Sequence, residues 1–427
     1  MDGLRVGRQT RVPGQCSRPA TGPRGGTPAP RGRDDRRPSP AVGGPRSGRR
    51  RRGPRILLKA RPTPAQLADR LAPPVPDGLE LYIHEDDVAG AGWLAALDRT
   101  IGGHAYPPDF TWIVEGPVWS LDGELFGICR NAEPDRELTR RLVRLAAHLG
   151  AVAVNIHCVH GSPDHRVLDE AARTAALERA IPFLEWYAGL CRDAGVQPLI
   201  ENVPPVCRMR RGAFIFTPLG VEPRDLEACV RAVPGLGLTL DTSHAQLAVN
   251  AFRGVPAPPS PPSLATAAAY YCDRGGPPTL AAYLEPLLPW TRSVHVSNAA
   301  GLLDEGLPYD AGDADLDAAV RLLARTAACF VTEPIDPDDD HAALKREIQQ
   351  RLARVLGVHL AGGEQARGSI GADDRRTRSP ARAPAPPPGR GAGPPRRGAG
   401  AADDGSSRSV VGRRPSVVPP RPRVTPP

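Results

Sequence analysis

Eight short apolar runs, each followed by a segment with helical periodicity, dominate the middle of this 427-residue chain. In several of the intervening segments apolar residues recur with the spacing of one helix face, as at Leu138, Leu142, Leu145 and Leu149. Nearly continuous apolar strands that alternate with helices are typical of parallel strands covered by helices. Eight such units predict an α/β fold, a closed (β/α)8 TIM barrel. The runs span residues 55–60, 79–85, 110–116, 151–158, 196–202, 236–242, 291–298 and 329–334.

The two ends of the chain have a different composition. Residues 1–54 and 359–427 consist largely of Arg, Pro, Gly and Ala, and such segments cannot bury a hydrophobic core. We therefore expect two disordered tails around one barrel domain at residues 55–358. The net charge of +8 lies mostly in these tails. They would bind nucleic acid only weakly, through phosphate contacts, or serve as solvated extensions without a partner.

Cysteine use and hydropathy bear on the cellular location. The eight cysteines form no CxxC pair, and several lie in apolar runs, as buried thiols do in a reducing compartment. No apolar stretch is long enough to cross a bilayer, and the N-terminus lacks the apolar core of a signal peptide. These features predict a soluble cytoplasmic protein without a membrane partner.

Most of the predicted strands end on a carboxylate or an imidazole. In a TIM barrel the carboxyl ends of the strands meet at one mouth, where the active site lies. One such residue alone is usually a helix cap, but several negative charges in one mouth are costly unless a cation neutralises them. The sequence therefore predicts a divalent metal. The strand-end residues are Glu115, His157 with His160, Glu201 with Asn202, Asp241 with His244, His295 with Asn298, and Glu333.

We expect Glu201, Asp241, His295 and Glu333 to bind the metal. Three carboxylates and one imidazole favour Mn²⁺ or Mg²⁺, with Co²⁺ or Zn²⁺ as alternatives. One ion between two carboxylates suits proton transfer next to a carbonyl, with Glu201 and Glu333 as the catalytic groups. Residues expected to bind substrate are His157, His160, His244, Asn202, Glu115, Asn298 and Arg208.

Four short motifs carry a resemblance to a known family. "LIENV", "LDTSHA", "VHVSN" and "VTEP" occur in this order, one per strand, within residues 55–358. Together they resemble the xylose-isomerase-like TIM barrels, which include sugar isomerases and epimerases and the endonuclease IV type of apurinic endonuclease. The resemblance to the epimerase branch implies one metal held by Glu201, Asp241, His295 and Glu333, with His244 near substrate or a second metal.

The endonuclease branch is similar but needs three zinc ions and more histidines. This chain has Glu115 in "VEGP" where that branch has a histidine, and Gly306 or Pro308 where it has another. His157 matches a zinc ligand on the fourth strand. The resemblance therefore favours a sugar, sugar-phosphate or hydroxy-carbonyl isomerase or epimerase acting through an enediolate on a carbohydrate-like substrate. An apurinic endonuclease, with nucleic acid as partner, and a non-catalytic binding module are the alternatives.

Three further segments carry smaller expectations. Lys59 and Lys345 are the only lysines, so a Schiff-base aldolase would depend on Lys59 alone and ranks low. Arg208, Arg210 and Arg211 follow the fifth strand and would grip a phosphate group or remain solvated loop charges. The Pro-rich segment 253–278 would act as a lid or be disordered.

Overall fold

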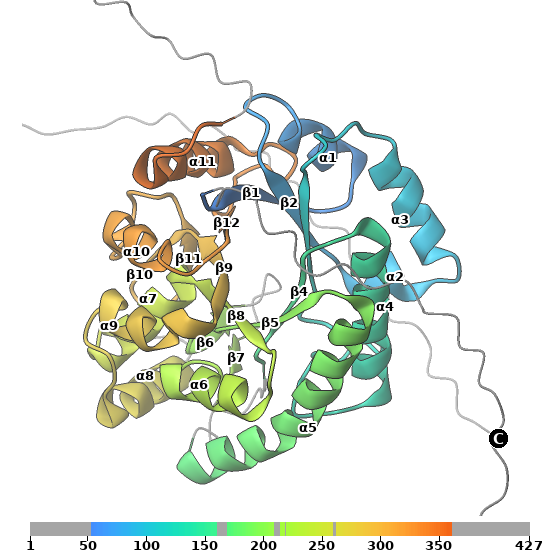
Figure 1. The fold of residues 1–427 in the computed structure, drawn as a ribbon. Helices are drawn as coiled ribbons and strands as arrows, with labels where there is room; N and C mark the ends of the chain where they lie inside the picture. The colour runs from blue at the N-terminus through green and yellow to red at the C-terminus, as the bar shows by residue number, and fades with distance from the viewer. Residues whose placement is uncertain (1–52, 160–168, 209–213, 218, 259–261, 361–427) are drawn as a thin grey trace, which may run out of the picture. The chain divides into compact units, whose positions relative to one another are not determined.

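The predicted barrel is confirmed. A computed structural model describes residues 53–159, 169–208, 214–217, 219–258 and 262–360, and Figure 1 shows their arrangement. Eight parallel strands close in the order β1-β12-β9-β8-β5-β4-β3-β2. They are β1 (Arg55–Ala60), β2 (Gly78–Tyr82), β3 (Thr111–Glu115), β4 (Ala153–His157), β5 (Gln197–Glu201), β8 (Gly237–Asp241), β9 (Thr291–Val296) and β12 (Cys329–Thr332).

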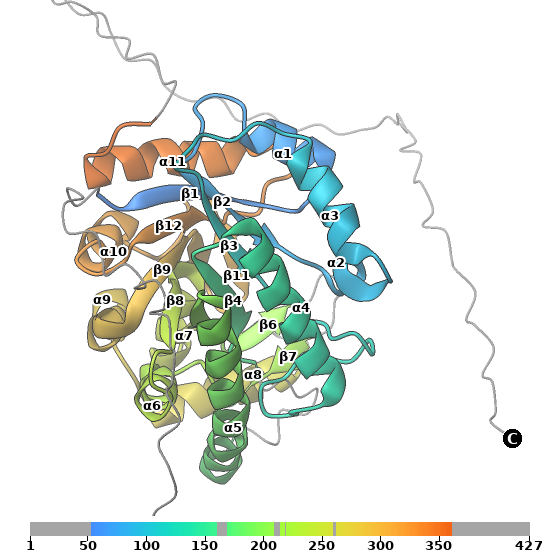
Figure 2. The ribbon, with the colours of Figure 1, turned by 45° about the vertical axis from the view of Figure 1, so that its right-hand side comes forward.

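Helices form the outer ring around these strands, as Figures 1 and 2 show. The longer ones are amphipathic: in α4 the residues Leu138, Leu142 and Leu145 are buried, and Gly150 ends the helix in a left-handed conformation. The helices are α1 (Pro64–Arg70), α2 (Glu85–Ala89), α3 (Trp93–Gly102), α4 (Glu133–Leu149), α5 (Glu170–Ala194), α6 (Pro223–Ala232), α7 (Thr242–Phe252), α8 (Pro262–Arg274), α9 (Leu280–Leu284), the 3₁₀ helix η2 (Glu285–Trp290), α10 (Leu316–Leu323) and α11 (Ala343–Leu356).

The barrel interior changes from apolar to polar along the strands. Leu57, Ile113, Ala153, Leu199 and Val331 belong to one buried apolar cluster inside the barrel. Two residues further along, each of these strands carries a polar side chain, because successive residues of a strand alternate between its two faces. These polar residues are Lys59, Glu115, Asn155, Glu201 and Glu333. The barrel interior is therefore filled by apolar side chains near the start of the strands and lined by polar side chains at the mouth.

The region after β8 differs from the sequence-based expectation. The alternation of runs predicts one helical segment between the sixth and seventh strands, but α7 begins immediately after Asp241 and is followed by α8, α9 and η2 before β9. Ten of the eleven residues of α7 are buried, so its sequence has no polar face that would reveal a helix. Asp241 Oδ1 accepts a hydrogen bond from His244 N (2.8 Å) and thereby caps this helix.

The Pro-rich segment 253–278 contains α8 rather than only irregular chain. Leu264, Ala267 and Tyr271 of this helix are buried, and the first two pack with Val206 and Phe216. Val206 and Phe216 lie in the hairpin formed by β6 (Val206–Arg208) and β7 (Phe214–Phe216). A second hairpin, β10 (Asn298–Ala300) and β11 (Asp304–Leu307), follows β9.

The proposed tails fall almost entirely outside the described residues, which begin at residue 53 and end at residue 360. Within the described part of the chain, no helix is both long enough and apolar enough to span a membrane.

Candidate metal centre

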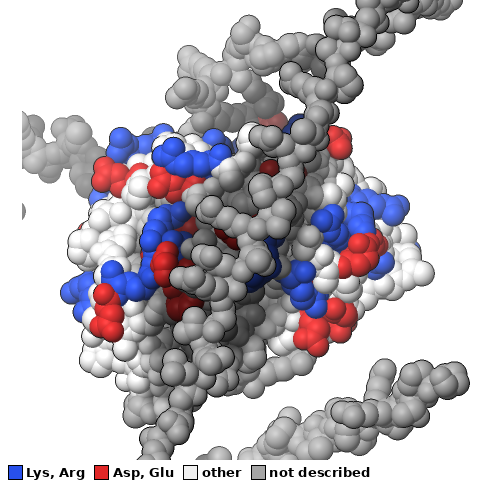
Figure 3. Space-filling model, turned by 90° about the horizontal axis from the view of Figure 1, so that it is seen from below, with Lys and Arg blue, Asp and Glu red and all other residues white. Residues whose placement is uncertain are grey.

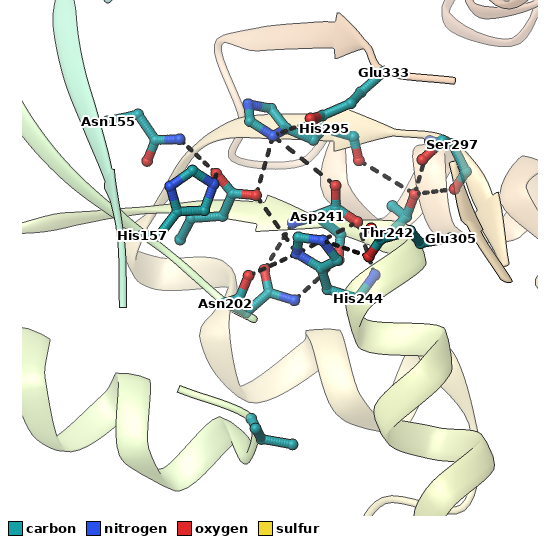
Figure 4. Close-up of polar contacts among 12 residues, drawn as sticks. Asn155, His157, Asn202, Asp241, Thr242, His244, His295, Ser297, Glu305 and Glu333 are labelled. Atoms are coloured by element: carbon teal, nitrogen blue, oxygen red, sulfur yellow. Dashed lines mark hydrogen bonds and ion pairs between the residues drawn. The ribbon is translucent and has the colours of Figure 1, made fainter. Parts of the chain in front are cut away.

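The four residues expected to bind a metal come together at the barrel mouth. Glu201 and Asp241 end β5 and β8, His295 lies in β9, and Glu333 follows β12 directly. These four strands are neighbours in the barrel. One donor atom from each residue lies within 4.8 Å of the donors of the other three. Figure 4 shows Asp241, His295 and Glu333 turned toward one another.

His295 is held in one orientation by Glu80 of β2. Its Nε2 lies 2.7 Å from Glu80 Oε1, and neither side chain is exposed to solvent. Its Nδ1 lies 3.3 Å from Glu201 Oε1, 3.9 Å from Asp241 Oδ2 and in contact with Glu333 Oε2. When Nε2–H donates to Glu80, the lone pair of Nδ1 points at the three carboxylates. This is the arrangement by which a carboxylate orients a metal-binding histidine.

Glu201 and Asp241 each use one oxygen for structure and turn the other to the centre. Asn155 Nδ2 donates to Glu201 Oε2 (2.6 Å), which leaves Glu201 Oε1 without a hydrogen-bond partner among the described residues. Asp241 Oδ1 caps α7, while Asp241 Oδ2 faces His295. The two carboxylates are thus fixed before any ligand arrives.

The electrostatics of the cluster favour a cation. Burial and nearby carboxylates raise the pKa of Asp241 to about 6, against the effect of His244. Burial would also raise the pKa of Glu201, but His295 and His157 outweigh burial and lower it to about 2. Burial lowers the pKa of His295, yet Glu201 and Glu333 hold it well above its usual value. The carboxylates therefore attract positive charge strongly, as a cation site requires.

The donor set fits a divalent metal ion. Glu201 Oε1, Glu333 Oε2 and His295 Nδ1 are buried and make no hydrogen bond within the described chain. Buried polar atoms without a hydrogen bond are rare, and these three meet at one point, where His295 forms ion pairs with both glutamates. Such a group of donor atoms is suited to bind a ligand. Three carboxylates with one imidazole suit Mn²⁺ or Mg²⁺, and also accommodate Co²⁺ or Zn²⁺.

A second group of charged residues adjoins the first. Glu115 is fully buried and forms an ion pair with Lys59, whose Nζ lies 2.6 Å from Glu115 Oε2 and also contacts Glu333. His157 Nε2 lies 3.4 Å from Glu115 Oε1 and 3.9 Å from Glu201 Oε2. Burial raises the pKa of Glu115 well above its usual value, although Lys59 opposes this shift. Glu115, His157 and Glu201 also bring three donor atoms close together.

His244 lies on the first turn of α7, at the edge of the cluster. Its Nδ1 lies 2.8 Å from the carbonyl oxygen of Asn202, and its Nε2 is 3.6 Å from Glu305 Oε2. Burial lowers its pKa, but Asp241 and Glu305 outweigh burial and raise it to about 10. Nδ1–H is thus committed to the backbone, and Nε2 is the atom turned toward Glu305 and the mouth.

Two expected substrate-binding residues are engaged with the backbone instead. The amide of Asn202 donates to Asp241 O and accepts from Asp241 N. The amide of Asn298 donates to Tyr309 O and Ala314 O and accepts from Ala314 N. Neither residue lines the mouth cavity, so the structure gives both a supporting position.

The other residues expected to bind substrate or phosphate lie at the end of a described segment or outside the described residues. Arg208 ends β6, whereas His160, Arg210 and Arg211 lie outside the described residues. Four residues of the site do not follow from the strand-end pattern. They are Lys59, for which the sequence suggests only a Schiff-base role, and Glu80, Asn155 and Glu305. Glu80 carried a signal, because it is a lone charge within the apolar run "LELYIHE". Glu305 carried no such signal in the sequence, because its contact with His244 depends on the fold of the β10–β11 hairpin.

The cluster opens into a cavity of about 900 Å³. This size lies within the range of about 300–1,000 Å³ that is usual for small-molecule sites. Its wall combines acidic, basic and aromatic side chains. Those nearest the cluster or on its loops include Lys59, Arg61, Tyr82, His84, Glu115, Trp119, His157, Asp241, His244, Glu305, Glu333, Ile335 and Lys345.

Similar solved structures include a D-tagatose 3-epimerase-like protein (17% identity, TM-score 0.49, 71% of this chain and 98% of that one). They also include an L-ribulose 3-epimerase (14%, 0.48, 71% and 95%) and a family 2 AP endonuclease from Brucella melitensis (15%, 0.42, 68% and 97%). No curated protein matches the sequence. Residues 93–355 match the family described as "Xylose isomerase-like TIM barrel", and the chain belongs to this family.

Proposed function

We propose that this protein is a metal-dependent isomerase or epimerase of a sugar, a sugar phosphate or a related hydroxy-carbonyl compound. The observation that carries the proposal is the convergence of donor atoms from Glu201, Asp241, His295 and Glu333. Three of these atoms, Glu201 Oε1, His295 Nδ1 and Glu333 Oε2, are buried and make no hydrogen bond within the described chain. A cavity of about 900 Å³ leads directly to this cluster. Its size suits a small molecule rather than a macromolecule.

Proton transfer would use the two glutamates at the ends of the ligand arc. A bound divalent ion supplies positive charge that stabilises the negative charge developing on the substrate as a proton leaves. Glu201, on β5, and Glu333, after β12, would remove a proton next to the carbonyl and return it, through an enediolate. Glu333 lines the cavity, whereas Glu201 lies beneath it and is held by Asn155. Glu333 is therefore the more accessible of the two bases.

Two histidines would orient substrate hydroxyl groups. His157 and His244 both line the cavity on the side of Glu201 and Asp241. Because His244 Nδ1–H is committed to Asn202 O, its Nε2 is the atom that meets a hydroxyl. Glu115 would act on substrate only indirectly, since its side chain is fully buried and paired with Lys59, whereas that of Glu333 is 25% exposed. A carbohydrate-like small molecule is accordingly the expected partner.

The endonuclease alternative requires more bound metal than this mouth readily supports. Glu115, which stands where that branch has a histidine, is paired with the ammonium of Lys59. Nucleic-acid binding also calls for a basic surface. In Figure 3, the described surface on the face shown mixes Lys and Arg with Asp and Glu, and neither sign forms a continuous patch there.

Metal content and proton exchange test the proposal together. The full-length protein, equilibrated with Mn²⁺ and freed of excess metal, should retain about one ion per chain. In D₂O it should catalyse metal-dependent exchange of a carbon-bound hydrogen in some member of a panel of ketoses, aldoses and their phosphates. Retention of three ions with cleavage of abasic DNA would favour the nuclease, and the absence of both metal and exchange would favour a binding module.

Conservative substitutions identify the bases. Glu201→Gln and Glu333→Gln should each slow exchange by about 10²–10⁴-fold, the usual contribution of a general base. Glu227→Gln is the matched control and should leave exchange unchanged, because Glu227 pairs with Arg231 within α6 and does not line the cavity. Unaltered metal binding and exchange in both cluster variants would rule out the proposed mechanism.

A further inference from the structure

We propose that the ammonium of Lys59 acts as a built-in cation that takes the place of a second metal ion, and that removing it opens a second metal site at Glu115, His157 and Glu201. This inference rests on the proposed function in one respect, namely that Glu201, Asp241, His295 and Glu333 hold an ion. It concerns how many ions the mouth accepts, which the four-residue set does not itself determine.

The described part of the mouth contains three overlapping groups of side chains that could hold a metal ion. The first is the four-residue set, and the second consists of Glu115, His157 and Glu201. In the third, formed by Glu80, Glu115 and His295, Glu80 already bonds to His295. Glu201 belongs to the first two groups, with Oε1 facing His295 and Oε2 facing His157 at 3.9 Å. A glutamate that turns one oxygen to each of two donor groups is suited to bridging two ions. If only one ion binds in the mouth, a physical feature must keep a second ion from binding to the second group.

Lys59 connects the two groups. It lies near the end of β1, and its Nζ contacts one carboxylate from each group: Glu115 Oε2 at 2.6 Å and Glu333 Oε1. The ammonium also stands 5.3 Å from the ring centre of Tyr82, a favourable position for a cation. Its side chain is only 13% exposed, so solvent screens its charge little. The position of this positive charge is thus defined on three sides.

The charge of Lys59 makes the second group a poor metal site. The second group contains only two carboxylates, Glu115 and Glu201. The ammonium of Lys59 already balances the negative charge of Glu115. A divalent ion bound to Glu115 Oε1 would lie beside the ammonium in a poorly solvated region, where like charges repel strongly. Without Lys59, Glu115 would be a buried, unpaired carboxylate, which is costly and is relieved by binding a cation. Glu115, His157 and Glu201 would then supply two oxygens and one nitrogen, a set suited to the same ions as the first site.

Lys59→Met tests this inference, because methionine retains most of the length of the side chain without its charge. The full-length protein and the variant are equilibrated with Mn²⁺, freed of excess metal and analysed for metal per chain. The expected result is one ion in the wild type and two in Lys59→Met. Electron paramagnetic resonance gives a second readout, since two neighbouring Mn²⁺ ions interact magnetically and a single ion does not.

The only other lysine provides a matched control. Lys345 also lines the mouth, but its Nζ bonds to Asp336 Oδ2 (2.7 Å) and Pro334 O (2.8 Å) and not to Glu115. Lys345→Met makes the same change in charge and should retain one ion. The double variant Lys59→Met/Glu115→Gln should also return to one, because it removes the carboxylate that the second ion needs. Lys59→Gln replaces Lys59→Met if the methionine variant does not fold.

The outcomes separate this inference from the function on which it rests. One ion in both the wild type and the Lys59 variant, or two ions in both, would overturn the inference and leave the isomerase proposal in place. A wild-type chain that retains no ion would overturn the proposed function itself. Two ions in Lys345→Met as well would show that total charge, rather than the position of Lys59, controls the count.

Discussion

The two halves of the barrel mouth, one formed by β1 to β4 and the other by β5, β8, β9 and β12, differ in how their charged side chains are paired. At the ends of β5, β8, β9 and β12, three carboxylates and one imidazole direct donor atoms at one point. They belong to Glu201, Asp241, His295 and Glu333. On β1 to β4, the charges are matched within the chain: Lys59 pairs with Glu115, and Glu80 bonds to His295. Both halves occupy the same layer at the carboxyl ends of parallel strands.

This difference shows that one half of the mouth is suited to bind a metal ion, whereas residues of the other half orient the side chains that would bind it. The half in which three carboxylates meet is suited to hold a metal ion, and the half that contributes Lys59 limits where that ion can sit. Glu80 and Asn155 belong to the supporting half, yet each contacts a ligand of the other half. Residues that only orient ligands usually affect metal affinity less than the ligands but more than distant residues.

Removing the support of His295 should produce the largest effect among changes outside the ligand set. Glu80→Leu is expected to lower metal affinity by about 10–100-fold, the usual range for a residue that orients a ligand. The cause is loss of the acceptor that fixes the Nε2–H tautomer of His295. Titration calorimetry with Mn²⁺ measures the affinity directly.

Comparing Glu80→Gln with Glu80→Leu separates the effect of the hydrogen bond to His295 from the effect of the charge of Glu80. Its amide oxygen still accepts a hydrogen bond from His295 Nε2 but carries no charge, so its loss of affinity should be smaller than that of Glu80→Leu. Equal affinity in the wild type and Glu80→Leu would show that the two halves of the mouth are independent. Nitrogen chemical shifts of the His295 ring provide a readout that a purely structural role would not change.

Asn298 should affect stability rather than metal binding. Its side chain ties β10 to the chain at Tyr309 and Ala314, and Asn298→Ala leaves several buried backbone groups without partners. The free energy of unfolding should fall by about 1–3 kcal/mol. Urea denaturation measures this change, and metal affinity should remain within error of the wild type. A loss of substrate affinity without a loss of stability would instead return Asn298 to the substrate-binding set.

Removing both ends of the chain should have the smallest effect. A chain reduced to residues 53–360 retains every strand and helix of the barrel and both halves of the mouth. We expect its metal affinity and thermal midpoint to match those of the full-length protein. Failure of this chain to fold, or a changed metal stoichiometry, would show that the terminal segments contribute to the barrel.

Much of the barrel, and the convergence of four strand-end residues at its mouth, was predictable from sequence for one physical reason. Parallel strands buried on both sides produce apolar runs, and their carboxyl ends must meet at one end of the barrel. The final residues of four runs could therefore be assigned to one site before their distances were known. Helix α7 was missed because it is buried almost all round, so it lacks the alternation on which helix prediction depends.

The sequence alone therefore determined the eightfold repeat, the position of the mouth and four residues that face it. Only the tertiary structure decided which charges are already balanced. Lys59 and Glu333 are 274 residues apart, and Glu80 and His295 are 215 residues apart, so no local pattern connects them. Closure of the barrel brings both pairs into contact. Electrostatic energy depends on distance and burial rather than on order along the chain, which is why the role of Lys59 emerged only in the folded protein.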